Sequence, residues 1–253
     1  MSGILYKLKP KRGLSYVLHL GLSALLPFIL FILIKLQPIT AILMVIVSKW
    51  RIFAVRPRYW LPNIRANGVD LIVAFSYLIF IYQASNGSGL EQLLIIALYV
   101  IWLTVIKPRS SSLFIGLQAV LGQFIGLMAL FSFQSSSAPA LWILIVGGWL
   151  ICYLSARHFF TIFDEAFSSL YSHTWGYFAG ALIWILGHWL IYYYGAYAQP
   201  VIILTVLGIG LSGLYYLKQN ERLSTQLKRQ IIIVMVAVTF VVVFLSNWSS
   251  KSF

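Results

Sequence analysis

Residues 200–217 read PVIILTVLGIGLSGLYYL and contain no charged side chain. A helix needs about 20 mainly apolar residues to cross the hydrocarbon core of a bilayer. Proline is favoured in the first turn of a helix, and Pro200 opens this run. A charged residue, Lys218, follows it directly. The stretch therefore predicts a membrane-spanning helix that begins at Pro200 and ends before Lys218.

Similar apolar runs recur along the whole chain. Of its 253 residues, 61% are hydrophobic and only 9% are charged, whereas a soluble domain carries roughly 25% charged residues. Lipid must therefore be the solvent for most of the surface, and we predict an all-α, polytopic helix bundle that forms one transmembrane domain over residues 1–253. Reading the apolar runs against their breakers predicts about nine spans, near residues 14–34, 38–55, 68–83, 89–106, 111–133, 139–157, 174–194, 200–217 and 230–247.

The basic residues gather in alternate connections between these spans. Cytosolic loops of membrane proteins are rich in Lys and Arg. With the N-terminus in the cytosol and the C-terminus outside, all of the 18 basic residues except Lys35 and Lys251 fall on the cytosolic side. Whether 38–55 crosses fully is left open, because Lys49 and Arg51 follow its uncharged part. The pattern predicts a multi-pass protein of a bacterial-type inner (plasma) membrane, whose cytosolic side contacts anionic lipid headgroups.

The connection SARHFFTIFDEAFSSLYS, residues 155–172, has apolar residues at helical spacing. It predicts an amphipathic helix near residues 158–171, lying at the cytosolic interface. An extension of the sixth span folded under the bundle is the alternative. Acid, base and histidine occur together only here, and such a group could bind a phosphate or carry acid–base chemistry, or it could be an ion-pair network that fixes the loop. The candidate catalytic residues are His158, Asp164, Glu165 and His173, with Arg157 as a candidate lipid- or substrate-binding residue.

Polar residues within or beside the spans supply further candidates for substrate or lipid binding. His188 falls in the seventh span, and an ionisable group inside a span is a functional candidate by default. Gln118 and Gln123 fall in the fifth span, where hydrogen bonds between helices are the simpler explanation. Arg56 and Arg58 stand beside aromatic residues of the kind that occupy the membrane interface, and they suit lipid headgroups.

Glycines at four-residue spacing predict close helix contacts. This spacing lets helices approach in lipid. Packing inside the bundle is the simpler reading, while a membrane-protein partner or a homo-oligomer through either face is the alternative. The residues in this pattern are Gly122, Gly126, Gly176, Gly180 and Gly187.

The sequence names no reaction. The four histidines have no metal-ligand spacing, so we predict no metal and no cofactor. The loops leave no room for a folded nucleic-acid-binding module. We therefore favour a membrane-embedded subunit, or an assembly or scaffold factor, without catalytic activity. The alternatives are a permease or flippase for a neutral or lipid-like substrate, and an enzyme acting on a lipid-linked or phosphorylated substrate at the cytosolic surface.

Overall fold

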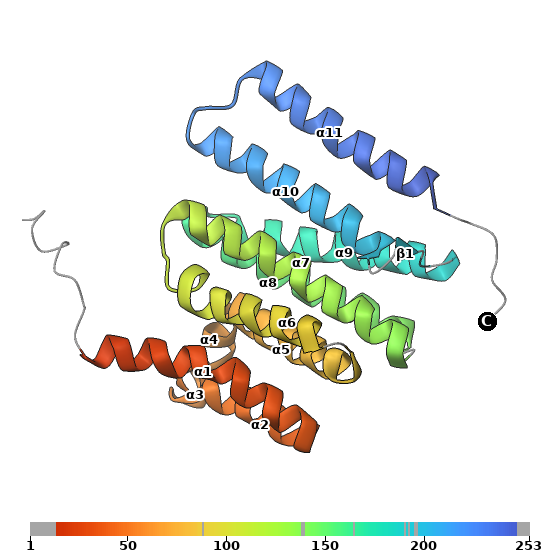
Figure 1. The fold of residues 1–253 in the computed structure, drawn as a ribbon. Coiled ribbons are helices and arrows are strands. Elements are labelled where there is room, and N and C mark those ends of the chain that lie inside the picture. The colour runs from red at the N-terminus through yellow and green to blue at the C-terminus, as the bar shows by residue number, and fades with distance from the viewer. Residues whose placement is uncertain are drawn as a thin grey trace, which may run out of the picture.

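The chain forms long helices that lie side by side, with α1 at one edge and α11 at the other (Figure 1). The computed structural model describes residues 14–246 apart from 88, 138–139, 164, 190, 192 and 195–196, and only the backbone of 14–20, 86, 134–137 and 189. The long helices are α1 (Leu14–Leu36), α2 (Pro38–Ser48), α5 (Gly68–Gln83), α6 (Gly89–Ile101), α7 (Ser112–Ser137), α8 (Leu141–Phe159), α9 (Ser168–Trp189), α10 (Gln199–Gln219) and α11 (Thr225–Phe244). The short elements are α3 (Trp50–Phe53), η2 (Pro57–Tyr59), α4 (Trp60–Ala66), η3 (Ala84–Asn86), the π-helical turn η4 (Trp102–Ile106), η5 (Phe160–Ile162) and the strand pair β1 (Tyr193–Tyr194) and β2 (Tyr197–Ala198).

Several of these helices can cross a membrane. Within the described residues, five are long and apolar enough, and a sixth span results if the segments Pro57–Ala66 and Gly68–Gln83, bent by 74°, count as one. The fold is thus all-α, as predicted, and its helices indicate a membrane protein. The five are Gly89–Ile106, Ser112–Phe133, Leu141–Ile162, Gln199–Gln219 and Thr225–Phe244.

The helix predicted over 38–55 is shorter than expected. α2 ends at Ser48 after 11 residues, which is about 16 Å of helix against a hydrocarbon core of roughly 30 Å. The backbone leaves the helical conformation at Lys49, whose side chain is only 5% exposed and lies 2.5 Å from Asp70. A buried ammonium needs a partner. Turning the chain toward α5 supplies that partner, and residues 50–66 form only short helices.

The prediction of an amphipathic helix near 158–171 is wrong. α8 and η5 end before Phe163, whose backbone is extended (φ −116°, ψ 144°), and α9 begins at Ser168. Two of its apolar side chains pack against protein, because the rings of Phe160 and Phe163 lie 5.2 and 5.1 Å from the ring of Tyr215 on α10. This part of the predicted apolar face is thus covered by α10 and not by lipid.

Two large cores and a small third one hold the described bundle together. The first joins α1, α2, α5 and α6 around the buried side chains of Tyr99 and Trp102. The second joins α7, α8, α9 and α10 around Leu127, Phe131 and Ile183. In the third, Val242 attaches α11 to α9 and α10, although only 6% of α11 over its most apolar 18 residues is buried. The cavity described below lies beside the second core, and Trp175 packs against that core and lines the cavity.

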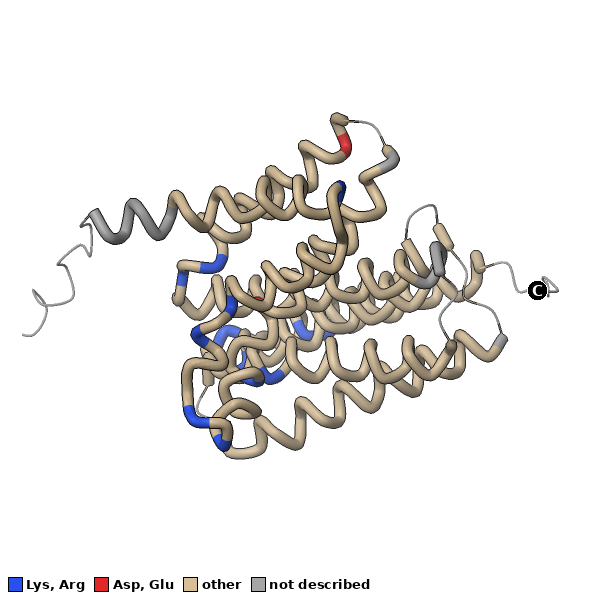
Figure 2. The backbone as a smooth tube through the Cα atoms, turned by 90° about the horizontal axis from the view of Figure 1, so that it is seen from below, with Lys and Arg blue, Asp and Glu red and all other residues tan. Residues whose placement is uncertain are grey.

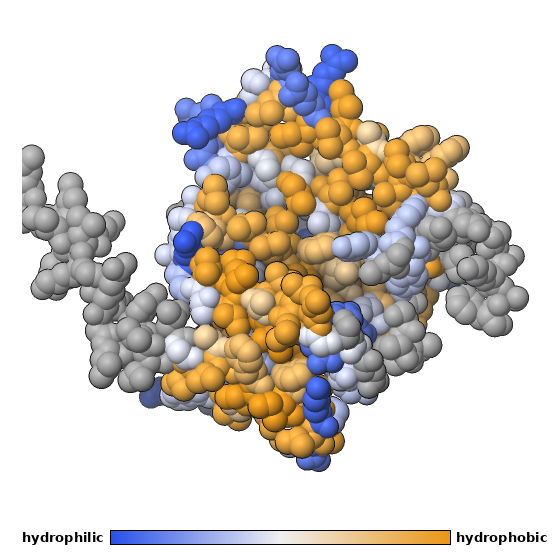
Figure 3. All heavy atoms as spheres, in the orientation of Figure 1, coloured by the Kyte–Doolittle hydropathy of each residue, from blue (hydrophilic) through white to orange (hydrophobic). Residues whose placement is uncertain are grey.

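The surface matches a protein in lipid. Large apolar side chains are exposed, and Figure 3 shows a face made mostly of hydrophobic residues. Most of the described Lys and Arg residues lie toward one end of the helices (Figure 2). Apolar flanks with a charged end are the distribution expected of helices that cross a bilayer.

Candidate functional site

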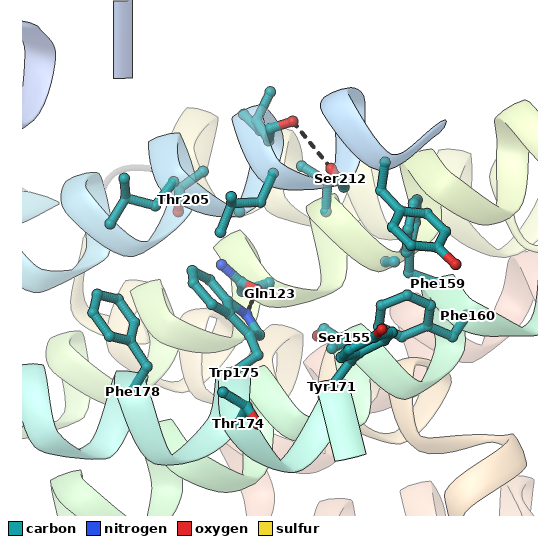
Figure 4. Close-up of a pocket in the computed structure, with 18 of the residues that line it drawn as sticks. Gln123, Ser155, Phe159, Phe160, Tyr171, Thr174, Trp175, Phe178, Thr205 and Ser212 are labelled. Atoms are coloured by element: carbon teal, nitrogen blue, oxygen red, sulfur yellow. Dashed lines mark hydrogen bonds between the residues drawn. The ribbon is translucent and has the colours of Figure 1, made fainter. Parts of the chain in front are cut away.

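A cavity of about 680 Å³ lies between α7, α8, α9 and α10 (Figure 4). Its walls are mainly aliphatic and aromatic. α10 is tightly packed in its first half, where Val201 and Leu204 are fully buried. Farther along, small residues leave space between the helices: Ala119 on α7, Ala156 on α8 and Gly208 on α10 all line the cavity. The sequence thus makes the cavity by placing small side chains on three facing helices.

Gln123 crosses the middle of the cavity wall and links three helices. Its Nε2 donates to the backbone carbonyl of Leu204 on α10 at 2.8 Å. Its Oε1 accepts from the indole nitrogen of Trp175 on α9 at 2.9 Å. Gly208 makes room for the amide, because a Cβ there would lie 2.7 Å from Gln123 Nε2. Gln123 therefore fixes the spacing of α9 and α10 rather than offering free hydrogen-bonding groups.

Two other polar groups in the cavity wall are not occupied in this way. The hydroxyls of Ser155 on α8 and Thr205 on α10 are buried and have no hydrogen-bond partner among the described residues. Figure 4 shows Thr205 on α10 and Ser155 on α8 on either side of Gln123. A buried hydroxyl without a partner costs about 1–3 kcal/mol. These two hydroxyls are therefore polar atoms of the wall to which the described part of the chain gives no partner.

Aromatic side chains close the cavity at the end near η5. Tyr215 on α10 lies against the rings of Phe159 and Phe160, and its hydroxyl donates to the carboxylate of Glu165. That hydrogen bond, together with the backbone N–H of Phe167, holds the pKa of Glu165 below its usual value. The α8–α9 connection is thus joined to α10 by one charge-assisted hydrogen bond.

The histidine and arginine next to this connection have separate partners. His158 Nε2 lies 3.0 Å from Gln118 Oε1. Gln118 Nε2 in turn donates to the backbone carbonyls of Ile106 and Arg109, at 2.8 and 2.9 Å. Arg157 Nη1 donates to Ser168 Oγ at 2.7 Å. His158 and Gln118 therefore hold the α6–α7 connection, and Arg157 holds the start of α9.

The remaining members of the candidate catalytic group do not converge. His173 stacks on Tyr153, with ring centroids 4.5 Å apart. The ring centroid of Tyr177, one turn later on α9, lies 6.2 Å from that of His173. In the described part of the chain, no hydrogen bond or ion pair joins His158, Glu165 and His173 to one another. Asp164 lies outside the described residues. His158, Glu165 and His173 thus each contact different residues and do not form one site.

His188 is not deep within a span. α9 ends at Trp189, so His188 belongs to its last turn, and its exposed side chain lies 5.9 Å from the ring of Trp184. The seventh helix runs from 168 to 189 rather than 174–194, because the chain after it turns into the strand pair β1–β2. Arg56 and Arg58 are exposed near η2, where the Arg58 guanidinium lies 4.6 Å from the Tyr59 ring centroid. None of these residues lines the cavity.

The glycines lie at contacts between helices of the same chain. A Cβ on Gly122 would lie 2.6 Å from a methyl group of Val69, and one on Gly126 would lie 2.5 Å from a methyl group of Ile72. The nearest atoms to a Cβ on Gly176, Gly180 and Gly187 belong to Trp149, Ile145 and Leu141, at 3.0, 3.6 and 2.5 Å. At three of the five positions a side chain would force a neighbour to shift, and the helices that these glycines join are α7 with α5 and α9 with α8.

A buried charge cluster lies apart from the cavity. Asp70 Oδ2 lies 2.5 Å from Lys49 Nζ and 2.9 Å from Lys107 Nζ. The π-helical turn η4 precedes Lys107 and lets its backbone N–H bond to the carbonyl of Trp102. From its place in the first turn of α5, Asp70 would also favour the helix dipole. The partners come from 21 and 37 residues away in sequence, so only the fold reveals the cluster.

The described residues offer no ready metal site, since nowhere among them do three His, Cys, Asp or Glu side chains gather. Sequence reasoning found Gln123 but missed Ser155, Thr205 and Tyr215. The sequence did contain a signal for two of them, because Ser155 and Thr205 are polar residues within the apolar runs predicted at 139–157 and 200–217.

The described fold defines the class of the protein as a helical membrane protein with a cavity between four of its helices. Comparison of the chain with protein-family models, with curated proteins and with solved structures finds no match in any of the three.

Proposed function

We propose that the protein binds a lipid-like amphiphile in the cavity between α7, α8, α9 and α10, as the substrate site of a permease or flippase. One observation carries the proposal. The cavity is walled by apolar and aromatic side chains, yet it contains the buried hydroxyls of Ser155 and Thr205, which have no partner among the described residues.

The size and lining of the cavity suit a ligand. Small-molecule sites are typically about 300–1,000 Å³, mainly apolar, with a few polar groups that orient the ligand. A cavity of about 680 Å³, with two buried hydroxyls in its wall that have no partner among the described residues, meets these conditions. Its walls belong to helices with apolar outer surfaces, so a ligand that partitions into the bilayer would have direct access. These properties favour an amphiphile with a long apolar body over a small polar solute.

The sequence alone favours a non-catalytic subunit or scaffold, whereas the cavity favours a permease or flippase. A non-catalytic subunit or scaffold needs no internal cavity, so the cavity gives it no support. An enzyme at the cytosolic surface would need His158, Glu165 and His173 to act together, and each has a different partner. The permease or flippase is the function that makes use of the cavity.

Filling the cavity tests the proposal. Ala119 is 3% exposed and lines the cavity, so Ala119→Phe should occupy the ligand volume. Ala181, exposed on the outer face of α9, provides the matched control Ala181→Phe. The full chain would be reconstituted in vesicles of phosphatidylethanolamine and phosphatidylglycerol, and the transfer of a fluorescent short-chain lipid between leaflets would be measured. Native mass spectrometry after gentle extraction would count the lipids that stay bound.

We expect Ala119→Phe to lose both the retained lipid and the transfer, while Ala181→Phe keeps both. Ser155→Leu provides a second filling variant in case Ala119→Phe does not fold, as judged by its helical circular dichroism. Equal lipid retention by the wild type and both folded filling variants would show that the cavity is not the binding site. Retained lipid without transfer would leave a lipid-binding protein that is not a flippase.

We also propose that the chain is oriented in the membrane as its charges predict, with the N-terminus and the basic connections in the cytosol. The ion pair of Lys49 with Asp70 supports this orientation, because it brings the end of α2 to the same level as the start of α5. Labelling of single cysteines introduced at Leu36 and Ser110 tests it, since Cys152, the protein's own cysteine, is buried. We expect an impermeant thiol reagent to modify Leu36→Cys from outside and Ser110→Cys only after permeabilisation.

A further inference from the structure

A second hollow continues the cavity toward the α10–α11 connection. It has a volume of about 510 Å³ and shares Leu211, Tyr215 and Lys218 with the cavity. Beyond these shared residues its walls include Lys228 on α11 and Glu221 in the connection. The apolar cavity therefore leads into a space lined by charged residues, and one elongated molecule could occupy both.

The charges in this second hollow are mainly positive. Lys218 stands at the end of α10 and Lys228 in the second turn of α11. In the described part of the chain neither ammonium lies within 4 Å of a carboxylate. The nearby carboxylate of Glu165 is already hydrogen-bonded to Tyr215 and to the backbone of Phe167. Glu221 is thus the one acidic residue among the described lining residues that faces two lysines.

The position of Lys228 adds to this argument. The N-terminal end of a helix carries a partial positive charge and favours anions. Ser224 caps α11 by accepting a hydrogen bond from the N–H of Leu227 at 3.1 Å. A lysine placed close to that end raises the positive potential further, and this arrangement suits a bound anion.

We infer that the occupant is a lipid phosphate, with its apolar chain in the cavity and its phosphate between Lys218 and Lys228. The inference rests on the proposed function and specifies its substrate class. A lysine ammonium is a compact cation that binds phosphate oxygens well. Tyr215 lines both spaces, so it stands where the polar and apolar parts of such a molecule would meet.

The chain offers a matched pair of variants. The double substitution Lys218→Gln with Lys228→Gln removes both cations of the second hollow. The double substitution Arg222→Gln with Arg229→Gln removes the same charge from the same connection, but neither arginine lines the hollow. The two variants thus separate a specific phosphate site from the general attraction of a basic surface for anionic lipid.

The full chain would be placed in nanodiscs of phosphatidylcholine that contain equal amounts of phosphatidic acid and diacylglycerol with the same acyl chains. Native mass spectrometry then measures the preference of the protein for phosphatidic acid over diacylglycerol. A basic residue near an anionic lipid contributes about a factor of five to binding, so two lysines give about thirtyfold. We expect the wild type and the arginine variant to prefer phosphatidic acid by this factor. We expect the lysine variant to retain diacylglycerol unchanged and to lose the preference.

Three outcomes overturn the inference, and a fourth refutes the proposed function. A preference that survives in the lysine variant would place the phosphate elsewhere. An equal loss in the lysine and arginine variants would reduce the effect to general surface charge. Retention of both lipids without preference would leave the cavity as a lipid site with no phosphate specificity, whereas retention of neither lipid by the wild type would refute the lipid-binding function itself.

Discussion

Replacing Asp70 by asparagine should lower the free energy of unfolding more than replacing either of the lysines that contact it. Asp70 Oδ2 lies 2.5 Å from Lys49 Nζ and 2.9 Å from Lys107 Nζ, and the three side chains are 16%, 5% and 43% exposed respectively. The other carboxylate oxygen, Oδ1, is buried and has no hydrogen-bond partner among the described residues. One carboxylate therefore neutralises a buried cation and a half-exposed one.

The exposed fraction of each side chain determines how much its replacement should destabilise the protein. Asp70→Asn leaves the buried ammonium of Lys49 without a counter-charge, and breaking a buried pair in this way costs about 3–5 kcal/mol. Lys107→Gln removes a solvent-screened partner, for which about 0–1 kcal/mol is usual. Lys49→Met removes a charged hydrogen bond of about 1.5–3 kcal/mol but leaves Asp70 paired with Lys107. The expected order of destabilisation is therefore Asp70→Asn, then Lys49→Met, then Lys107→Gln.

Unfolding of each variant by sodium dodecyl sulfate in mixed micelles, followed by circular dichroism, gives the free energies. Glu221→Gln is the control, because Glu221 is an exposed carboxylate outside the cluster and its loss should change stability by less than about 0.5 kcal/mol. If Lys107→Gln destabilised the protein as much as Asp70→Asn, the assignment of Lys49 as the buried partner would be wrong. A cost below about 1 kcal/mol for Asp70→Asn would mean that the cluster is hydrated.

Three further changes test other contacts. Gly126→Ala places a Cβ 2.5 Å from a methyl group of Ile72 and should cost about 1–3 kcal/mol in the same unfolding assay, whereas Gly213→Ala, with no atom within 4 Å of the new Cβ, should be neutral or stabilising by up to about 1 kcal/mol. Gln118→Leu removes the donor to two backbone carbonyls and should cost about 1–3 kcal/mol, together with faster proteolysis of the α6–α7 connection; unchanged proteolysis would count against this role. Because the folded pKa of Glu165 lies below its unfolded value, its hydrogen bond from Tyr215 stabilises the protein above the unfolded pKa and is lost as the pH falls through the folded pKa. The thermal midpoint of the wild type should thus fall more steeply in acid than that of Glu165→Gln, and parallel curves would refute the contact.

The sequence predicted the helices well where an uncharged run is bounded by clear breakers. The span predicted at 89–106 has the limits found for α6 with η4. α11 begins at Thr225 rather than at 230, because Ser224 caps the helix and its first turns are polar. Hydropathy detects the part of a helix that suits lipid and misses a polar end, because it records only which residues are apolar.

The errors occurred where a distant partner changed a local preference. The spacing of apolar residues in 158–171 does suit a helix, but Tyr215 on α10 offers the same residues a protein surface. The uncharged run before Lys49 suits a longer span, but Asp70 draws that lysine inward. In both cases contacts made across the fold outweigh a helical preference that amounts to tenths of a kcal/mol per residue.

The sequence by itself determined that the chain is all-α and apolar enough for a membrane, because hydropathy and charge are summed along a helix and need no partner. The position of Gln123 within a span was also readable. Only the tertiary structure decided that Gln123 bonds to Trp175 and Leu204, that Ser155 and Thr205 face one cavity, and that Lys218 stands where it opens into a charged hollow. A cavity is the space that side chains from separate helices leave between them, so it exists only once those helices have packed.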